Sequence, residues 1–235
     1  MRVSKRLVLV SAALASMLAA PASMAVEITP LSQTRNALTG FGTDYVATDF
    51  GLFDVPGRHV SSIGSQSLSA SLAAAGGSAV DPPDPEPFGY GESSTFLLDF
   101  EIDEDASFSL TGSLDVTSND LDGWTNGAAS ITLRSYNPTT MLYSTIFEQV
   151  ASTQLELWPI HYDFDQSGLL PAGQYQIDLQ SGGQGFEHSE NGFFWTDSEA
   201  QLSFELTEIP EPGTGALLGG ALSLLALRRR LGRRS

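Results

Sequence analysis

The feature that most restricts the fold of this chain is an alternation of apolar and polar residues. Between residues 95 and 103 every second side chain is apolar, at Phe96, Leu98, Phe100 and Ile102. The same period of two recurs at Ser107–Val116, Ala129–Tyr136, Gln174–Gln180 and Glu199–Thr207. Successive side chains of a β-strand point to opposite faces, so this period predicts strands that bury one face. No stretch has a convincing amphipathic helical pattern.

Three further segments have weaker strand patterns. Small polar and apolar residues alternate from His59 to Leu72, which predicts one long, lightly packed strand that Ala73–Gly77 ends. Met141–Val150 and Gln154–Phe164 are the other two candidates. Turns rich in Gly, Pro, Asn or Asp separate the predicted strands, at 104–105, 119–127, 137–138, 168–173 and 181–191. One-faced strands joined by such turns are typical of an antiparallel β-sandwich or jelly-roll-like domain.

A proline-rich run, Asp-Pro-Pro-Asp-Pro-Glu-Pro, occupies residues 81–87. Proline has no backbone donor and a fixed φ, so we expect a stiff, exposed loop and not a strand interior or a helix. The run could also be a linker between two domains. However, the segment before it has too few large apolar residues to build a core alone. We therefore expect one domain over residues 26–208, with this loop inside it.

The N-terminus has the features of a secretory signal peptide, residues 1–25. Arg2, Lys5 and Arg6 precede the apolar run Leu7–Ala20, and small residues at Ser23 and Ala25 suit cleavage after Ala25. The apolar run is short for a stable membrane span. An uncleaved anchor is the alternative, and the small-residue site directly after the run disfavours it.

The charge balance is strongly acidic once the two ends are set apart. Of the 11 basic residues only Arg35, Arg58 and Arg134 lie between Val26 and Leu227, against all 28 acidic residues, a net charge of −25. Phosphate binding needs clustered Lys and Arg, so a nucleic-acid partner is excluded as a class. Cations, divalent ones included, are the natural small partners of such a polyanion. The absence of Cys removes disulfides, thiol catalysis and cysteine-ligated zinc.

Residues 209–235 combine three elements in a fixed order. Pro210, Glu211 and Pro212 come first, an apolar run to Leu227 follows, and the arginines Arg228, Arg229, Arg230, Arg233 and Arg234 close the chain. This order at the C-terminus resembles the PEP-CTERM sorting signal of exported bacterial proteins. The resemblance implies export through Sec-type machinery, a membrane-inserted intermediate and processing by an exosortase near Pro210–Pro212. It also implies that Arg228–Arg230 form the cytoplasmic stop.

The physical chemistry of the tail agrees with a temporary anchor. From Gly213 to Leu227 an α-helix would be roughly 22 Å long, which is short of a bilayer's hydrocarbon core. Cytoplasmic arginines would hold its end by the positive-inside rule. An ordinary single-span anchor is the alternative. The strand-rich body also resembles that of many PEP-CTERM proteins and, at fold level, small exported pre-peptidase C-terminal sandwich domains, with Ala172-Gly173 before Tyr175. That likeness implies no activity.

Calcium is the best of the metal hypotheses. Asn119, Asp120 and Asp122 place side-chain oxygens close together in a glycine-containing loop, and Ca²⁺ takes six to eight oxygen ligands. The loop lacks the full EF-hand pattern. Other acidic candidates are Asp103–Asp105 and Asp163 with Asp165. The simpler interpretation is that these acids keep loops soluble and block edge pairing between strands.

Two other kinds of site are weaker hypotheses. Trp124 and Trp195 could form an aromatic platform for carbohydrate, with Trp158 and Phe193–Phe194 as further rings, although such rings more often fill a core. Paired carboxylates could hydrolyse a glycoside, but no pair stands out from so acidic a background. His59, His161 and His188 lack zinc-site spacing, and no G-x-S-x-G nucleophile motif is present.

We therefore expect a non-enzymatic exported protein of a bacterial cell surface or extracellular matrix, acting in surface structure, adhesion or biofilm. A carbohydrate-binding module for exopolysaccharide, with or without assistance from Ca²⁺, is the first alternative. A secreted glycoside hydrolase is the second. No catalytic residue and no cofactor other than Ca²⁺ is expected.

Overall fold

The structure, a computed structural model, describes residues 26–40, 42–81, 84–120, 125–153, 159–186 and 193–209. These residues form twelve strands. The strands are β1 (Thr29–Leu38), β2 (Asp44–Val46), β3 (Phe53–Val55), β4 (His59–Ile63), β5 (Ser67–Asp81), β6 (Asp84–Ile102), β7 (Ala106–Ser118), β8 (Thr125–Asn137), β9 (Leu142–Ser152), β10 (Ile160–Leu170), β11 (Gly173–Gly185) and β12 (Phe193–Glu208). All their pairings are antiparallel, which confirms the predicted all-β antiparallel class.

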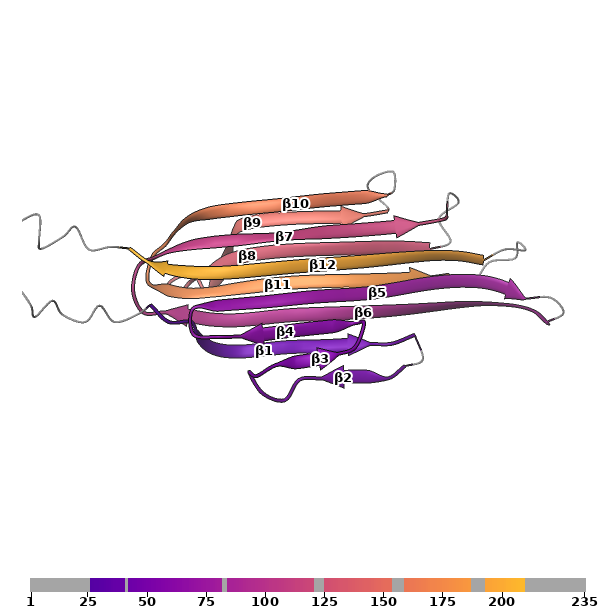
Figure 1. Ribbon diagram of the computed structural model, residues 1–235, viewed down its shortest axis with the longest axis horizontal. Coiled ribbons are helices and arrows are strands. Elements are labelled where there is room, and N and C mark those ends of the chain that lie inside the picture. The colour runs from indigo at the N-terminus through magenta and orange to yellow at the C-terminus, as the bar shows by residue number, and fades with distance from the viewer. Residues whose placement is uncertain are drawn as a thin grey trace, which may run out of the picture.

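The last eight strands pair like one long hairpin folded in half. β8 pairs with β9, β7 with β10, β6 with β11 and β5 with β12. Two further ladders, β7 with β12 and β8 with β11, roll this ribbon into two layers. The front layer has the order β10-β7-β12-β5 and the back layer the order β9-β8-β11-β6 (Figure 1).

The two layers join at one end and separate at the other. β5 and β6 pair only from Gly76 and Gly91 outward to Asp81 and Asp84, at what we call the far end. Toward the opposite, near end the two strands diverge. There β4 and β3 extend the front layer beside β5, while β1 and β2 extend the back layer beside β6. The result is a sheet nearly closed into a sandwich, in which β1 begins and β12 ends at the near end (Figure 1).

Inward side chains become smaller from the near end to the far end on β11 and β12. On β11 the series is Tyr175, Ile177, Leu179, Ser181 and Gly183. On β12, read backwards, it is Leu206, Phe204, Leu202, Ala200, Ser198 and Thr196. Phenylalanine and tyrosine rings pack together in the near half, with Phe100 5.7 Å from both Tyr175 and Phe204. In the far half glycine lets the two layers approach, because a Cβ on Gly183 would overlap the backbone of Ala75 and Gly76.

Several predicted boundaries were wrong. The single strand predicted at His59–Leu72 is two strands, β4 and β5, which turn at Gly64–Gln66 and pair His59 with Leu72. Ala73–Gly77 does not end a strand, since β5 runs through it to Asp81. The loop expected at 81–87 is the end of a hairpin, with β6 beginning at Asp84. The prolines of β6 are tolerated because this end of the strand pairs only with β5, and an edge position needs no further donor.

Other strands are longer than predicted or displaced. β10 begins at Ile160 and includes Gly168–Leu170, so the expected turn shrinks to Pro171–Ala172. β11 extends to Gly185, so strand replaces the first part of the predicted loop at 181–191. β12 begins at Phe193, ahead of the predicted start at Glu199. The signal peptide, residues 1–25, and the sorting signal from Pro210 onward lie outside the described residues. In the part of the chain that the structure describes, no helix has the length and hydropathy needed to cross a membrane.

Candidate functional site

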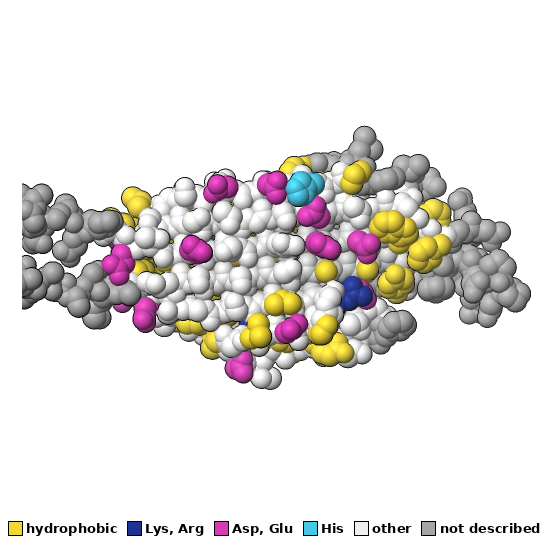
Figure 2. Space-filling model, viewed as in Figure 1, with side chains coloured by type: hydrophobic (Ala, Val, Ile, Leu, Met, Phe, Trp, Pro, Cys, Tyr) yellow, Lys and Arg dark blue, Asp and Glu magenta, His cyan; other side chains and the backbone are white. Residues whose placement is uncertain are grey.

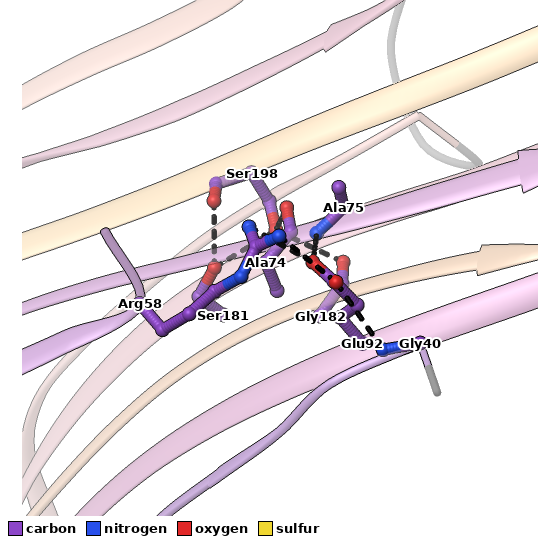
Figure 3. A network of polar contacts seen from close by, with 8 residues as sticks. All are labelled: Gly40, Arg58, Ala74, Ala75, Glu92, Ser181, Gly182 and Ser198. Atoms are coloured by element: carbon purple, nitrogen blue, oxygen red, sulfur yellow. Dashed lines mark hydrogen bonds and ion pairs between the residues drawn. The ribbon is translucent and has the colours of Figure 1, made fainter. Parts of the chain in front are cut away.

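A buried carboxylate holds the fork where β5 and β6 separate. Glu92 is 7% exposed, and both of its oxygens contact Arg58, each at 2.9 Å from a guanidinium nitrogen. The backbone N–H of Ala75 donates to Oε2 at 3.0 Å, and that of Gly40 donates to Oε1 at 3.2 Å. Figure 3 shows these donors converging on Glu92 from three sides. The carboxylate thereby joins four strands or their ends, and its role is structural.

Beside the fork, two serines link the layers. Ser181 of β11 donates a hydrogen bond to the carbonyl of Ser198 at 2.8 Å, and the two hydroxyl oxygens lie 2.9 Å apart (Figure 3). The Ser198 hydroxyl also lies within hydrogen-bond distance of the Gly182 and Ala74 carbonyls, at 3.0 and 3.3 Å. Buried hydroxyls need such partners. The contact between layers in the far half is therefore polar as well as close.

A second buried polar group lies between β1 and β4. The Arg35 guanidinium, 0% exposed, donates to the carbonyls of Gly51 at 2.7 Å and of Asp49, and to the Ser61 hydroxyl at 3.3 Å. It lies 5.7 Å from the ring centre of Phe53. Desolvation lowers the pKa of Arg35, with Asp49 opposing that shift. The guanidinium thus holds the segment 47–52 against β1 through hydrogen bonds to its carbonyls.

His59 shares Ser61 with Arg35. Its Nε2 lies 2.8 Å from the Ser61 hydroxyl, and its Nδ1 lies 3.0 Å from the Ser94 hydroxyl. Desolvation by burial lowers the pKa of His59 to about 4, and the positive charge of Arg35 acts in the same direction. A hydrogen bond to the Asn36 carbonyl partly opposes the shift. The imidazole is therefore neutral at neutral pH and is buried away from any substrate.

The outer face of the back layer carries a groove at its far half, about 600 Å³ in volume. We call it the back groove. Ser93, Gly182 and Ala128 face one another across β6, β11 and β8, and Gly91, Gln184 and Asn126 form the next row. Because four of these six residues are Gly, Ala or Ser, the surface is hollow there. The groups that border the hollow include the hydroxyl of Ser93 and the amides of Asn126 and Gln184, together with the apolar Leu38 and the charged Glu92.

The same face is tied together by side-chain hydrogen bonds at the near half. Asp99 accepts from Ser32 at 2.5 Å, from Gln176 at 2.9 Å and from Tyr143 at 2.9 Å. Arg134 donates to Gln176 at 2.7 Å. Burial and the bond to Asp99 raise the pKa of Tyr143 to about 12. This network spans β1, β6, β11, β8 and β9, and leaves the back groove as the open part of the face.

The outer face of the front layer carries scattered acidic side chains (Figure 2). His161 of β10 bridges two of them, with Nδ1 2.5 Å from Asp115 and Nε2 3.3 Å from Asp163. The bond to Asp115, followed by the bond to Asp163, raises the pKa of His161. A depression of about 490 Å³ lies nearby, lined by residues that include Arg58, Asp197 and Glu199.

Two of the predicted calcium residues, Asn119 and Asp120, are described, and their side chains bond to β12 and β8. The Asn119 side chain accepts a hydrogen bond from the Trp195 N–H at 2.7 Å and donates to the Phe193 carbonyl at 3.1 Å. Asp120 is buried and accepts from the Thr125 hydroxyl at 3.2 Å. Asp122 lies outside the described residues, so calcium binding stays a prediction. Among the described residues, no three His, Asp or Glu side chains form a metal-binding group.

Of the predicted aromatic platform, Trp195 is described and Trp124 is not. Trp195 lies on β12 in the front layer, opposite Gly77 of β5, and is half-buried. It is therefore part of a strand. Trp158, His188, Pro210, Glu211, Pro212 and Arg228–Arg230 also fall outside the described residues.

Sequence reasoning missed Glu92, Arg35 and the back groove. Glu92 continues the inward parity of Phe96, Leu98 and Phe100, and a carboxylate at such a position was the available signal for a buried ion pair. The groove had no signal in any single segment. It arises because small residues of three strands occupy the same register.

The comparisons with known proteins give no family. No protein-family model matches the chain, and no curated protein matches it. Among solved structures, the infectious bursal disease virus Gt strain shares 13% identity over 88% of this chain and 72% of that chain, with a TM-score of 0.22. The VP2 subviral particle of the same virus shares 12% identity over 88% and 73%, with a TM-score of 0.21. Scores this low carry no argument about fold or function.

Proposed function

We propose that the protein is a non-enzymatic, exported component of a bacterial cell surface or extracellular matrix, sorted through a PEP-CTERM signal. The observation that carries the proposal is the position of the chain ends. β1 begins and β12 ends at the near end (Figure 1). The proposed signal peptide, which precedes β1, and the proposed sorting signal, which follows β12, therefore both connect to the body at that end. Both faces and the far end remain free for surface structure, adhesion or biofilm contacts.

The charges of the body support the same proposal. Arg35 is buried, and Arg58 and Arg134 each face an acidic side chain, at 2.9 Å from Glu92 and 3.8 Å from Asp178. The part of the chain described contains no Lys and no other Arg. Anionic partners such as nucleic acid therefore find no free cationic side chain there. An acidic surface keeps such a body soluble outside the cell.

We also propose the finer fold class, a jelly roll. Its support is the pairing of eight strands as one ribbon folded in half and rolled into two four-stranded layers. The proposal of an N-terminal signal peptide and a C-terminal membrane-inserted sorting helix rests on residues 1–25 and 209–235 of the sequence.

Mass spectrometry of the protein expressed with its exosortase tests the sorting proposal. We expect loss of the C-terminal segment close to Pro210, Glu211 and Pro212, after passage through the inner membrane. A variant with all three motif residues replaced by alanine should keep its tail. Persistence of the intact arginine-rich end in the unaltered protein would reduce the segment to a simple anchor.

The second candidate function is carbohydrate binding. The open back groove favours it, because the charge of its lining residue Glu92 is balanced by Arg58. The sequence-based hypothesis placed the site at Trp124 and Trp195, with or without Ca²⁺ at Asn119, Asp120 and Asp122. Loss of glycan binding in Trp195→Ala would support that placement. An unchanged melting temperature in millimolar Ca²⁺ would remove the calcium hypothesis. Turnover of any polysaccharide in a panel would instead favour the hydrolase.

A further inference from the structure

We propose that the back groove binds a segment of a neutral, hydroxyl-rich polysaccharide lying across the strands of the back layer. The inference deepens the proposed function, since it gives a matrix protein its ligand class and its site. It also moves the carbohydrate site from Trp195 on the front layer to the opposite face of the sandwich.

The first argument concerns Gly182, in the middle of β11. A Cβ built on most of the far-half strand glycines would overlap neighbouring atoms, as at Gly183 and Gly185. At Gly182 a Cβ would meet nothing within 4 Å, and its φ is not in the left-handed region. Glycine in a strand interior costs roughly 0.5–1 kcal/mol relative to alanine. A glycine that packing does not require, in a central strand, marks a place where a ligand can approach the backbone.

The second argument concerns the groups that border the groove. The side chains of Asn126 and Gln184 have no hydrogen-bond partner within the described chain. Each amide offers both a donor and an acceptor, as does the hydroxyl of Ser93. Sugar hydroxyls also donate and accept, so these groups match them in both roles.

The third argument is electrostatic. The body carries a net charge of −25, yet the one charged residue that lines the groove is Glu92, whose carboxylate is already bound by Arg58 and two backbone donors. An anionic polymer would be repelled by the body, and a cationic one would bind the acidic front face more strongly. A neutral polymer is neither repelled by the acidic body nor attracted to the front face in preference to the groove.

The shape of the groove agrees with an extended chain. Leu38, Ser93, Gly182, Ala128 and Ser152 form one row across β1, β6, β11, β8 and β9. Five neighbouring strands span roughly 19 Å, because strands lie about 4.8 Å apart. The volume of about 600 Å³ is within the usual range of ligand sites.

The test is affinity electrophoresis of the full chain in mild detergent, through gels that contain a polysaccharide. The neutral probes are hydroxyethyl cellulose, dextran, mannan and galactan, and the charged probes are alginate and chitosan. Gly182→Val fills the groove at a position with open space. Ser113→Val makes the matched change on the outer face of β7 in the front layer. We expect retardation by at least one neutral probe, a loss of affinity of about tenfold or more in Gly182→Val, and unchanged retardation in Ser113→Val.

Melting temperatures separate a blocked site from a damaged fold. Gly182→Val should melt at or above the unaltered protein, because valine favours a strand. A milder double variant, Asn126→Ala with Gln184→Ala, should weaken binding several-fold without filling space. Retardation by none of the neutral probes, or equal retardation of Gly182→Val, would overturn the proposal. Binding only to chitosan would assign the ligand to the acidic front face.

This outcome is distinguishable from failure of the proposed function. C-terminal processing is read by mass spectrometry and does not involve the groove, so Gly182→Val should be processed like the unaltered protein. Normal processing without neutral-polysaccharide binding would remove the groove proposal alone. Binding without processing would remove the sorting proposal alone.

Discussion

The near and far halves of this sandwich are built from the same strands but by different chemistry. In the near half, Phe100, Phe204 and Tyr175 fill the space between layers with large rings. In the far half the same strands place Ser181, Ser198 and glycine inward, and hydroxyl groups bond across the interface. A thick apolar core and a thin polar contact thus lie within one continuous ladder of strands.

The difference shows two ways to join β-layers. Apolar burial is non-directional and tolerates some repacking, whereas backbone contact through glycine tolerates none. Most of the hydrophobic stabilisation therefore comes from the near half. The far half fixes the alignment of the two layers and brings them close together. Its small residues leave the outer surface hollow at the back groove.

The largest expected effect is in the near half. Phe204 is 0% exposed and contacts the rings of Phe100 and Phe108. Phe204→Ala should lower the free energy of unfolding by about 3–5 kcal/mol, because it leaves a cavity in a tight core. Urea denaturation measures this. Leu169→Ala, at a side chain that is 69% exposed, is the control and should change stability by less than about 0.5 kcal/mol. Similar losses for both variants would mean that the near half is not the main core.

A smaller effect is expected from pH, through His59 at the boundary between the halves. Its folded-state pKa of about 4 is below the usual 6.5, so the folded state favours the neutral ring. The stabilisation is complete above pH 6.5 and is lost as the pH falls toward 4. The loss should approach about 3 kcal/mol, at 1.36 kcal/mol per pKa unit.

His59→Gln isolates this contribution from the many carboxylates. The variant lacks the titrating group, so its unfolding free energy should fall less than that of the unaltered protein between pH 7 and pH 4.5. Equal pH dependence in the two proteins would show that the ring is not held neutral.

The smallest effect compares two adjacent glycines of the far half. Gly183→Ala should destabilise the protein by about 1–3 kcal/mol, because its Cβ would overlap the backbone of Ala75 and Gly76. Gly182→Ala should be neutral or stabilising by up to about 1 kcal/mol, since a Cβ there meets nothing. Thermal unfolding of the two variants measures the contrast. If both destabilise equally, the close contact between layers is not the reason for glycine.

The near half could be predicted from sequence because large apolar and polar side chains differ clearly at alternate positions of its strands. Leu98, Phe100 and Ile102 alternate with the acidic Asp99, Glu101 and Asp103, and the strand, its face and its burial follow directly. The far half lacks this difference, because its inward residues are mostly small. Ala73–Gly77 looks like a break in a strand when considered alone, and becomes intelligible only beside Gly183 and Gly185, more than a hundred residues later.

Two further features were not predicted, the turn at Gly64–Gln66 and the start of β6 at 84–87. Serine-rich alternation before and after Gly64 gave no sign of where the chain reverses, since either side suits a strand. Proline argued against a strand at 84–87, but its missing donor matters little where the strand has one partner. The sites were harder still, because Glu92 and the back groove depend on which strands become neighbours.

The placement of β12 has a mechanical consequence. It lies in the middle of the front layer, bonded to β5 from Phe193 to Glu205 and to β7 from Thr196 to Glu208. A pull on the chain beyond Ile209, against a ligand held in the back groove, would act along the axis of this strand. Both ladders would then be loaded in shear, so their hydrogen bonds would have to fail together and not one after another. The two ladders of β12 therefore give the C-terminal end of the body the bond geometry that best resists a pull along the strand.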